Sequence, residues 1–152
     1  MTATDPAAPR SSDPRVARIV NAFEALTPAD LRRLGDFYAP DADFKDPFNA
    51  VRGVPAIGQV FAHMYVALES PRFVIHDVLA QGDQCVLTWD FTFRFRRFNR
   101  EWQTVRGASH LKLDAHGLIT LHRDYWDAAE ELYEKLPGVG AVMRWLKRRA
   151  NS

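Results

Sequence analysis

The chain has 152 residues, of which 47% are hydrophobic and 26% charged, which is typical of one soluble globular domain with a single core. Its formal net charge of +1 gives no electrostatic basis for binding nucleic acid. No hydrophobic run approaches the roughly 20 residues that cross a bilayer, and the N-terminus lacks the hydrophobic segment of a signal peptide. We therefore expect a cytoplasmic protein, in which the single cysteine, Cys85, is buried and inert.

The first part of the chain predicts a loose tail and then a helix. Residues 1–13 are rich in Pro, Ala, Ser and Thr and bury too little surface to become ordered, so we expect a disordered tail. Asp13-Pro14 predicts an N-cap followed by proline at the first helical position. Apolar residues at helical spacing then indicate one buried face, formed by Val16, Ile19, Val20, Phe23 and Leu26.

Two further helices are expected before the strands. Thr27-Pro28 repeats the start signal, and the helix that follows ends at Pro40. Gly53-Val54-Pro55 opens the third helix, and Pro71 closes this helical region. The apolar positions are Leu31, Leu34, Phe37 and Tyr38 in the second helix and Ile57, Val60, Phe61, Met64 and Leu68 in the third.

From Arg72 to Asp127 the hydrophobic period changes to two, which predicts strands. The expected strands are Arg72 to Gln81, with Phe73, Ile75 and Leu79 on one face, Gln84 to Arg96, Trp102 to Asp114 and Leu118 to Asp127. The clearest alternation lies in the second strand, where every other residue is apolar: Leu87, Trp89, Phe91, Phe93 and Phe95. Such alternation indicates an antiparallel sheet with one buried face.

A helical tail is expected after the strands. Ala128 to Lys135 predicts a short helix, and Val139 to Arg149 predicts a last one with a basic face. That face is interpreted as solvated, and contact with a membrane surface is the alternative. Helices, then strands, then a tail are typical of an α+β fold with helices packed on one face of a curved antiparallel sheet. We expect one domain over residues 14–150, and its sheet and helices enclose a cone whose interior is the natural ligand site.

The segment FYAPDADFKDP at residues 37–47 carries a resemblance, together with Val51-Arg52-Gly53 and the helix start at Ala56-Ile57. From roughly residue 15 to 127 the chain resembles the nuclear transport factor 2-like superfamily, which includes ketosteroid isomerases, SnoaL-like polyketide cyclases and limonene epoxide hydrolases. The tail, HRDYWD followed by LYEKLPGVGAVMRWLKRR, resembles a bacterial SnoaL-like subgroup. The resemblance implies the cone fold of that superfamily, no cofactor and a homodimer through the outer sheet face.

The resemblance also implies roles for particular residues. In the isomerases the matching segment carries the catalytic base, and its place here is Asp46. The tyrosine and aspartic acid that hold the enolate oxygen in the isomerases are replaced by Ala22 and Ser109, so the strong oxyanion hole is missing. The cyclases use an aspartate on a late strand, which Asp124 matches. The epoxide hydrolases use an Arg-x-Asp pair on a central strand, but Asp90 there alternates away from the phenylalanine face.

Period two places His122, Asp124 and Trp126 on one face of the last strand, and the resemblance turns that face toward the cone. A carboxylate among apolar side chains holds a proton to higher pH, because burial disfavours its charged form, and can act as a base near neutral pH. The predicted catalytic residues are therefore Asp46, at the mouth of the cone, with His122 and Asp124. The predicted substrate-binding residues are Tyr38, Phe61, Trp89, Phe91, Ser109, Leu111 and Trp126.

Plainer interpretations stay open beside these. Asp46 could cap a turn, and His122 and Asp124 could form a buried pair whose members satisfy each other. No metal site is expected, because the chain has neither HExxH nor a Cys/His cluster. We expect the cone to bind a small apolar molecule, as a cofactor-independent isomerase, cyclase or hydrolase. The alternatives are a non-catalytic binding module and a protein-interaction scaffold whose interior is filled by its own aromatic side chains.

Overall fold

The computed structural model describes residues 10–97, 100–131, 145 and 148. Its helical elements are α1 (Pro14–Glu24), the 3-10 helix η1 (Pro28–Asp36), α2 (Val54–Ala67) and α3 (Ala128–Glu131). Its strands are β1 (Tyr38–Lys45), β2 (Ala50–Arg52), β3 (Leu68–Gln81), β4 (Gln84–Phe95), β5 (Gln103–Leu113) and β6 (Ile119–Tyr125). This is the predicted α+β class with three helical elements before the main strands. The last predicted helix, at 139–149, lies outside the described residues except for positions 145 and 148.

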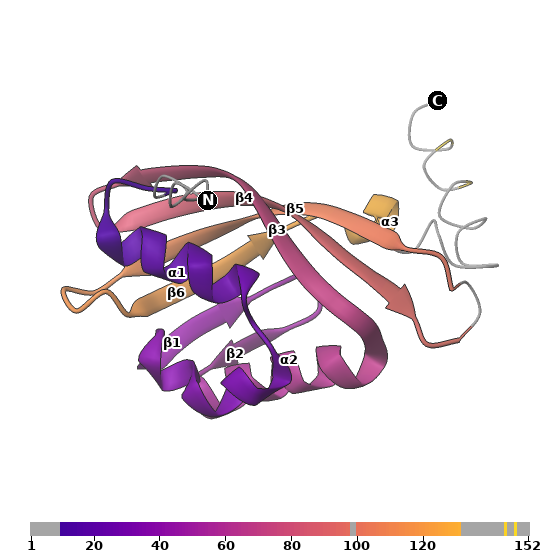
Figure 1. Ribbon diagram of the computed structural model, residues 1–152, viewed down its shortest axis with the longest axis horizontal. Helices are drawn as coiled ribbons and strands as arrows, with labels where there is room; N and C mark the ends of the chain where they lie inside the picture. The colour runs from indigo at the N-terminus through magenta and orange to yellow at the C-terminus, as the bar shows by residue number, and fades with distance from the viewer. Residues whose placement is uncertain (1–9, 98–99, 132–144, 146–147, 149–152) are drawn as a thin grey trace, which may run out of the picture.

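The strands form one six-stranded sheet in the order β2-β1-β6-β5-β4-β3. Figure 1 shows this sheet curving, with α1 and α2 on one side of it. All neighbouring strands are antiparallel except β1 and β6, which are parallel. The fully antiparallel sheet expected from the sequence is corrected here, because the long stretch of chain between β1 and β6 gives the crossover that a parallel pair needs.

The predicted helix starts are confirmed by their hydrogen bonds. The Asp13 carboxylate accepts the backbone N–H of Arg15 at 2.9 Å and pairs with the guanidinium of the same residue at 2.9 Å. The hydrogen bond from the Arg15 side chain lowers the pKa of Asp13 below its ordinary value, so this cap stays charged well into acid. At the start of η1, the Asp30 carboxylate accepts the backbone N–H of Thr27 at 2.8 Å.

Arg10, which lies inside the segment that the sequence predicts to be a loose tail, makes specific contacts. The Arg10 guanidinium donates to the carbonyls of Ile75 and His76 and pairs with Glu24 at 3.3 Å. Glu24 in turn accepts the N–H of Ile75 at 3.2 Å. Because β3 is an edge strand, these two side chains occupy backbone groups that would otherwise be open to pairing with another strand.

The second predicted helix ends earlier than expected, because β1 begins at Tyr38, before Pro40. Two bulges in β3 account for two further errors. The strand includes Pro71, because β3 has one residue more than β4 between Glu69 and Arg72, and a bulge tolerates the missing N–H of proline. A second extra residue between Ile75 and Val78 reverses the alternation. Leu79, predicted to be buried, is therefore 66% exposed, and Val78 packs against the core in its place.

The alternation predicted for β4 is confirmed, and its inward residues join the helices to the sheet. Cys85, Leu87, Trp89 and Phe93 are all buried. They pack in one core with the buried helix residues Val16, Ile19, Val20, Leu34, Ile57 and Phe61. The core thus lies between the concave face of the sheet and the three N-terminal helical elements, where the sequence places it.

Cys85 is expected to react slowly with a thiol reagent in the folded protein. Its side chain is 1% exposed, and burial raises the pKa of the thiol to about 11, so little thiolate is present at neutral pH. We expect a disulfide reagent such as DTNB to label the native chain about 100-fold more slowly than the chain in urea. Equal rates in the two conditions would contradict the burial of this thiol.

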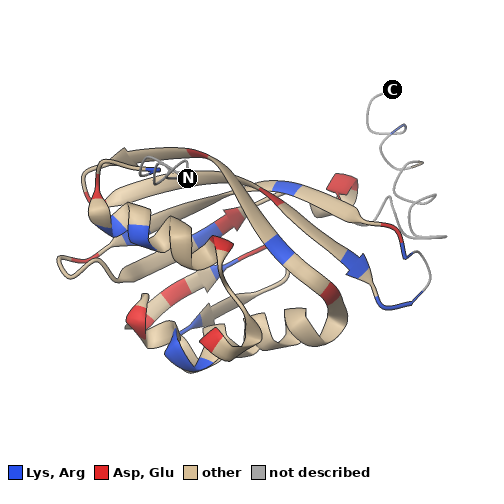
Figure 2. Cartoon of the chain, in the orientation of Figure 1, with Lys and Arg blue, Asp and Glu red and all other residues tan. Residues whose placement is uncertain are grey.

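Charged residues of both signs are interspersed along the helices and strands (Figure 2). The Arg52 guanidinium lies 3.7 Å from the Asp43 carboxylate. Glu69 forms ion pairs with Arg94 at 3.3 Å and with Arg100 at 2.9 Å. Pairs at the surface contribute little to stability one by one, so the fold depends mainly on its core. Within the described ranges, no helix is both long enough and apolar enough to cross a membrane.

Candidate functional site

The site is built on β6 and the strand beside it. His122 and Asp124 lie two residues apart on β6 and face inward, where the His122 residue is 4% exposed and the Asp124 side chain 13% exposed. In the register of β5 against β6, His122 pairs with Leu111 and Asp124 pairs with Ser109. The shared face predicted for these residues is therefore present, and it follows from the strand period alone.

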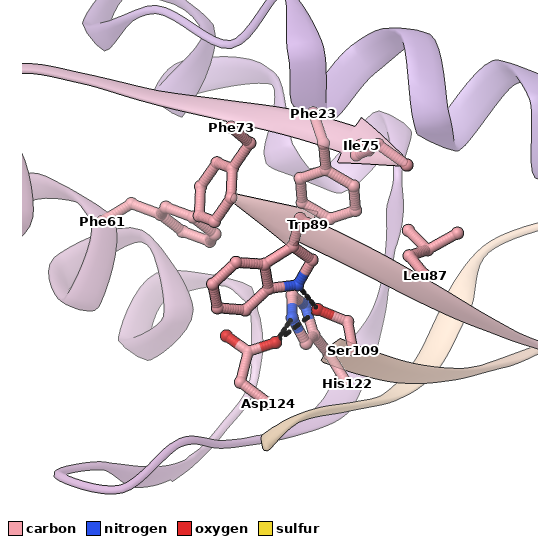
Figure 3. Close-up of a pocket in the computed structure, with 9 residues that line it drawn as sticks. All are labelled: Phe23, Phe61, Phe73, Ile75, Leu87, Trp89, Ser109, His122 and Asp124. Carbon is pink, nitrogen blue, oxygen red and sulfur yellow. Dashed lines mark hydrogen bonds and ion pairs between the residues drawn. The ribbon is translucent and has the colours of Figure 1, made fainter. Parts of the chain in front are cut away.

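A continuous line of hydrogen bonds runs through these side chains. Trp89 Nε1–H donates to Ser109 Oγ at 2.9 Å, and the Ser109 hydroxyl donates to Asp124 Oδ1 at 2.5 Å. His122 Nε2 lies 2.7 Å from the same Asp124 oxygen, and His122 Nδ1 lies 2.7 Å from the Tyr38 hydroxyl. Figure 3 shows Trp89 bonded to Ser109, and Ser109 and His122 both bonded to the carboxylate of Asp124. We call these five residues the polar line.

Aromatic rings fix the imidazole of His122 from several sides. Phe44 meets it edge-on with ring centroids 4.7 Å apart, and Phe23 does so at 5.6 Å. The Tyr38 ring lies almost parallel to it, with an interplanar angle of 4°. Because these neighbours leave little room for the ring to turn, the two nitrogen atoms of His122 keep their separate partners.

The polar line forms part of the wall of an apolar cavity. Helices α1 and α2 and strands β3 to β6 contribute its lining, which consists of Phe23, Phe61, Phe73, Ile75, Leu87, Trp89, Ser109, His122 and Asp124 (Figure 3). The open space is about 20 Å³, which is room for roughly one water molecule. The aromatic side chains therefore fill most of the cone, and a ligand larger than water needs some of them to move.

The cavity wall contains two titratable side chains, His122 and Asp124. Across the described part of the chain, no three His, Cys, Asp or Glu side chains come together as a group that suits a metal ion. A histidine and a carboxylate in contact are a pair suited to proton transfer, since one of the two side chains can accept a proton while the other holds the accepting side chain in place. The chemistry that this arrangement supports is therefore acid–base chemistry.

Comparison with known proteins gives the family of the chain. A family model described as the SnoaL-like domain matches residues 19–122, more than half of the chain. The chain belongs to the SnoaL-like domain family. The resemblance seen in the sequence is thus confirmed at the level of the family. No curated protein sequence matches this SnoaL-like chain.

Many solved structures have the same architecture, and the three that follow are distant in sequence from this chain. A hypothetical protein of ketosteroid isomerase-like fold from Catenulispora acidiphila, in complex with trimethylamine, has a TM-score of 0.67 and 18% identity, covering 80% of this chain and 92% of that one. A candidate SnoaL-like polyketide cyclase from Shewanella putrefaciens has a TM-score of 0.63 and 21% identity, covering 75% and 92%. TerC, co-crystallised with polyporic acid, has a TM-score of 0.63 and 17% identity, covering 76% and 91%. These similarities establish the nuclear transport factor 2-like cone as the fold of the SnoaL-like chain.

Asp46 does not reach the cavity of this SnoaL-like protein. Its Oδ1 accepts the backbone N–H of Phe48 at 2.8 Å and of Asn49 at 2.6 Å, and the Asn49 side-chain amide at 3.1 Å. These bonds close the turn between β1 and β2, which is the capping role that the sequence left open. The predicted convergence of Asp46 with His122 and Asp124 is therefore not found, and the geometry gives no support to a catalytic role for Asp46.

Four of the predicted substrate-binding residues belong to the site, in two different ways. Phe61, Trp89 and Ser109 line the cavity directly. Tyr38 does not line it, but its hydroxyl contacts His122 from behind. Tyr38 instead lines a second small space of about 10 Å³ between α1, η1 and β1, to which Phe23 also contributes.

The other three predicted substrate-binding residues lie outside the cavity wall. Phe91 packs behind it, with its ring centroid 4.7 Å from that of Phe73. Leu111 is fully buried in the core beside His122. Trp126 meets the ring of Phe48 at 5.4 Å, next to the turn that Asp46 closes. The inward face of a strand is thus longer than the cavity, so sharing that face does not place a residue in the wall.

The sequence analysis did not assign four of the lining residues to the site: Phe23, Phe73, Ile75 and Leu87. Each of them stands on an apolar face that the sequence predicts to be inward. The periodicity separates inward from outward residues, but it cannot say how far along an element the cavity extends. The signal was therefore present for burial and absent for contact with a ligand.

Proposed function

We propose that this SnoaL-like protein binds a small, largely apolar carbonyl compound in its cone and moves a proton on it without a cofactor, as an isomerase or cyclase. One observation carries the proposal. Asp124 is the one carboxylate in the wall of the apolar cavity, and both of its hydrogen bonds end on Oδ1. Oδ2 receives no hydrogen bond from the described residues, which leaves it available to take a proton from a ligand.

The surroundings of Asp124 suit this role. Its neighbours in the wall are mostly phenylalanine and aliphatic side chains, which keep bulk water away from the reacting atoms. A carboxylate held in hydrogen-bonding reach of a carbon acid contributes roughly 10²- to 10⁴-fold to the rate of proton transfer. An isomerase or a cyclase needs one such group, because the same carboxylate can return the proton at another position.

The donors of the polar line narrow the class of substrate. The line already engages the N–H of Trp89, both ring nitrogen atoms of His122 and the hydroxyl groups of Ser109 and Tyr38. An enolate oxygen would therefore meet no free donor among the described residues of this wall, and the oxyanion hole that drives simple ketone chemistry is missing. We infer that the substrate stabilises its own carbanion, as a β-dicarbonyl compound does.

The small volume of the cavity means that binding is accompanied by movement. Phe23 borders both the space of about 20 Å³ beside Asp124 and the space of about 10 Å³ beside Tyr38. It stands next to Glu24, the last residue of α1, and is only half-buried. Rotation of the Phe23 ring would join the two spaces into one, so we infer that this side chain yields to the ligand.

The similar structures support a small molecule as the ligand. One is described with trimethylamine and another with polyporic acid, both small compounds. The homodimer and the cytoplasmic location expected from the sequence remain part of this proposal. The mass in solution, measured by light scattering after size exclusion, tests the dimer.

Deuterium exchange tests the proposed chemistry. The protein is incubated in D₂O with matched pairs of compounds, each pair being a β-dicarbonyl and a simple ketone of the same carbon skeleton. Loss of the proton signal on the carbon next to the carbonyl is followed by NMR. We expect faster loss with protein than in buffer for at least one β-dicarbonyl, and a smaller acceleration for its ketone partner, because the site lacks a free donor.

A second candidate, a non-catalytic module, is favoured by the nearly filled cone. The same samples separate the two, since saturation-transfer NMR reports binding without reaction. If compounds of the matched pairs bind but their exchange is not accelerated, the result would contradict the proposed enzyme and support a binding module. Absence of both binding and exchange would support a scaffold filled by its own aromatic side chains.

A further inference from the structure

Tyr38 has one hydrogen-bond partner among the described residues, and it is His122. The Tyr38 residue is 1% exposed, and its hydroxyl lies 2.7 Å from His122 Nδ1. Burial, and then the charge of nearby Asp124, raise the pKa of Tyr38 well above its ordinary value, so the phenol keeps its proton. A buried hydroxyl proton needs an acceptor. The acceptor within reach is Nδ1, so Tyr38 donates to it.

This direction fixes the other nitrogen atom of the ring. A neutral imidazole that accepts at Nδ1 carries its hydrogen on Nε2. Nε2 lies 2.7 Å from Asp124 Oδ1, which is the distance of an N–H donor to a carboxylate. Nδ1 of the ring thus accepts a hydrogen bond from Tyr38, and Nε2 donates one to Asp124. His122 is left with no lone pair that faces the cavity.

The remaining neighbours of His122 do not change this pattern. Phe44 and Phe23 pack against the ring, and Leu111 stands opposite it on β5. None of these side chains titrates, so among the described residues the groups facing His122 that can carry charge or exchange a proton are Tyr38 and Asp124. On the far side of Asp124, the Ser109 hydroxyl donates to the same Oδ1.

We propose that Tyr38 and His122 are positioning residues, which hold Asp124 by its Oδ1 atom, and that His122 passes no proton to or from the ligand. The proposal rests on the proposed function and divides its labour: Asp124 Oδ2 exchanges the proton, and the rest of the polar line orients the carboxylate. Turning the carboxylate to present Oδ1 would break the bonds from both Ser109 and His122. The carboxylate therefore offers one defined oxygen to the cavity.

NMR of the ¹⁵N-labelled protein near neutral pH tests the pattern without any substrate. Long-range correlations between ring protons and nitrogen atoms are expected to show His122 with hydrogen on Nε2 and none on Nδ1. The His122 signals are identified by their loss in His122→Gln, and the exposed His63 and His116 serve as internal controls. Tyr38→Phe is expected to shift the Nδ1 resonance of His122, whereas Tyr65→Phe on α2 leaves it in place. Hydrogen on Nδ1 of the wild-type ring, or on both nitrogen atoms, would overturn the proposal.

The exchange assay then separates a positioning role from proton transfer. The side-chain amide of His122→Gln can donate to Asp124 but cannot shuttle a proton, so we expect the rate of exchange to fall only about three- to tenfold. Tyr38→Phe is expected to fall by a similar factor. A proton-carrying histidine would instead cost roughly 10²- to 10⁴-fold, and a loss of that size in a folded His122→Gln protein would overturn the proposal. Absence of exchange in the wild type would contradict the proposed function, while the NMR pattern would still decide the hydrogen-bond arrangement.

Discussion

Replacing Asp124 by Asn is expected to lower the protein-catalysed rate of deuterium exchange about 10³-fold, to near the rate in buffer. Asparagine has the size of aspartate, and its carbonyl oxygen can still accept from Ser109 and His122. The amide group in place of Oδ2 cannot take a proton, so the substitution removes the chemistry and keeps the packing. The measurement is the initial rate of exchange by NMR, with the melting temperature of the variant recorded beside it.

Asp46→Asn is the matched control for this prediction. It makes the same chemical change at the other acid that the sequence proposes as a base. Its Oδ1 accepts backbone hydrogens in the turn, and an asparagine oxygen does the same, so we expect a change of less than about twofold in rate. The reverse result, a large loss in Asp46→Asn and none in Asp124→Asn, would show that the base is Asp46.

Local signals predicted the starts of the three N-terminal helical elements and the central strands, but not where the helices end: Tyr38 and Pro40 lie in β1, and Leu68 begins β3. Asp13 before Pro14 gives a helix start because the cap depends on groups within two residues of it. The alternation around Trp89 gives β4 because every inward residue of that strand packs on the same core. The bulges of β3 were not predicted, because the position of an extra residue depends on how the strand pairs with its neighbour. Leu79 was consequently assigned to the wrong face.

The candidate site likewise has features that local signals predict and features that they do not. His122 and Asp124 share a face because of the strand period, and the resemblance supplied the direction of that face. The bond between Tyr38 and His122 joins residues 84 positions apart, so no local pattern reveals it. The catalytic role predicted for Asp46 finds no support, for the opposite reason. Its partners, Phe48 and Asn49, are close in sequence, and their backbone N–H groups engage the carboxylate in a local turn, away from the cavity.

Gly107→Ala is expected to lower the free energy of unfolding by about 2 kcal/mol, through its contact with Trp89. A Cβ atom at position 107 would lie 2.5 Å from Cη2 and 2.8 Å from Cζ2 of the Trp89 ring. The ring is buried and has little freedom to retreat, because Phe73 packs against it at 5.4 Å and its Nε1–H is held by Ser109 at 2.9 Å. The variant is therefore expected to disturb the polar line as well as the core. Urea unfolding followed by circular dichroism measures the loss.

Gly58→Ala is the control of opposite sign. Position 58 lies inside α2, and the nearest atom to an added Cβ is Leu34 Cδ1 at 3.8 Å, an ordinary contact. Alanine there is expected to raise stability by about 0.5–1 kcal/mol, since it reduces the freedom of the unfolded chain. Trp89→Phe in the Gly107→Ala background should recover part of the loss, because the smaller ring clears the added methyl group. If Gly107→Ala is as stable as the wild type, Trp89 does not lie against the backbone of β5. The hydrogen bond from Trp89 to Ser109 in the polar line would then not be in place.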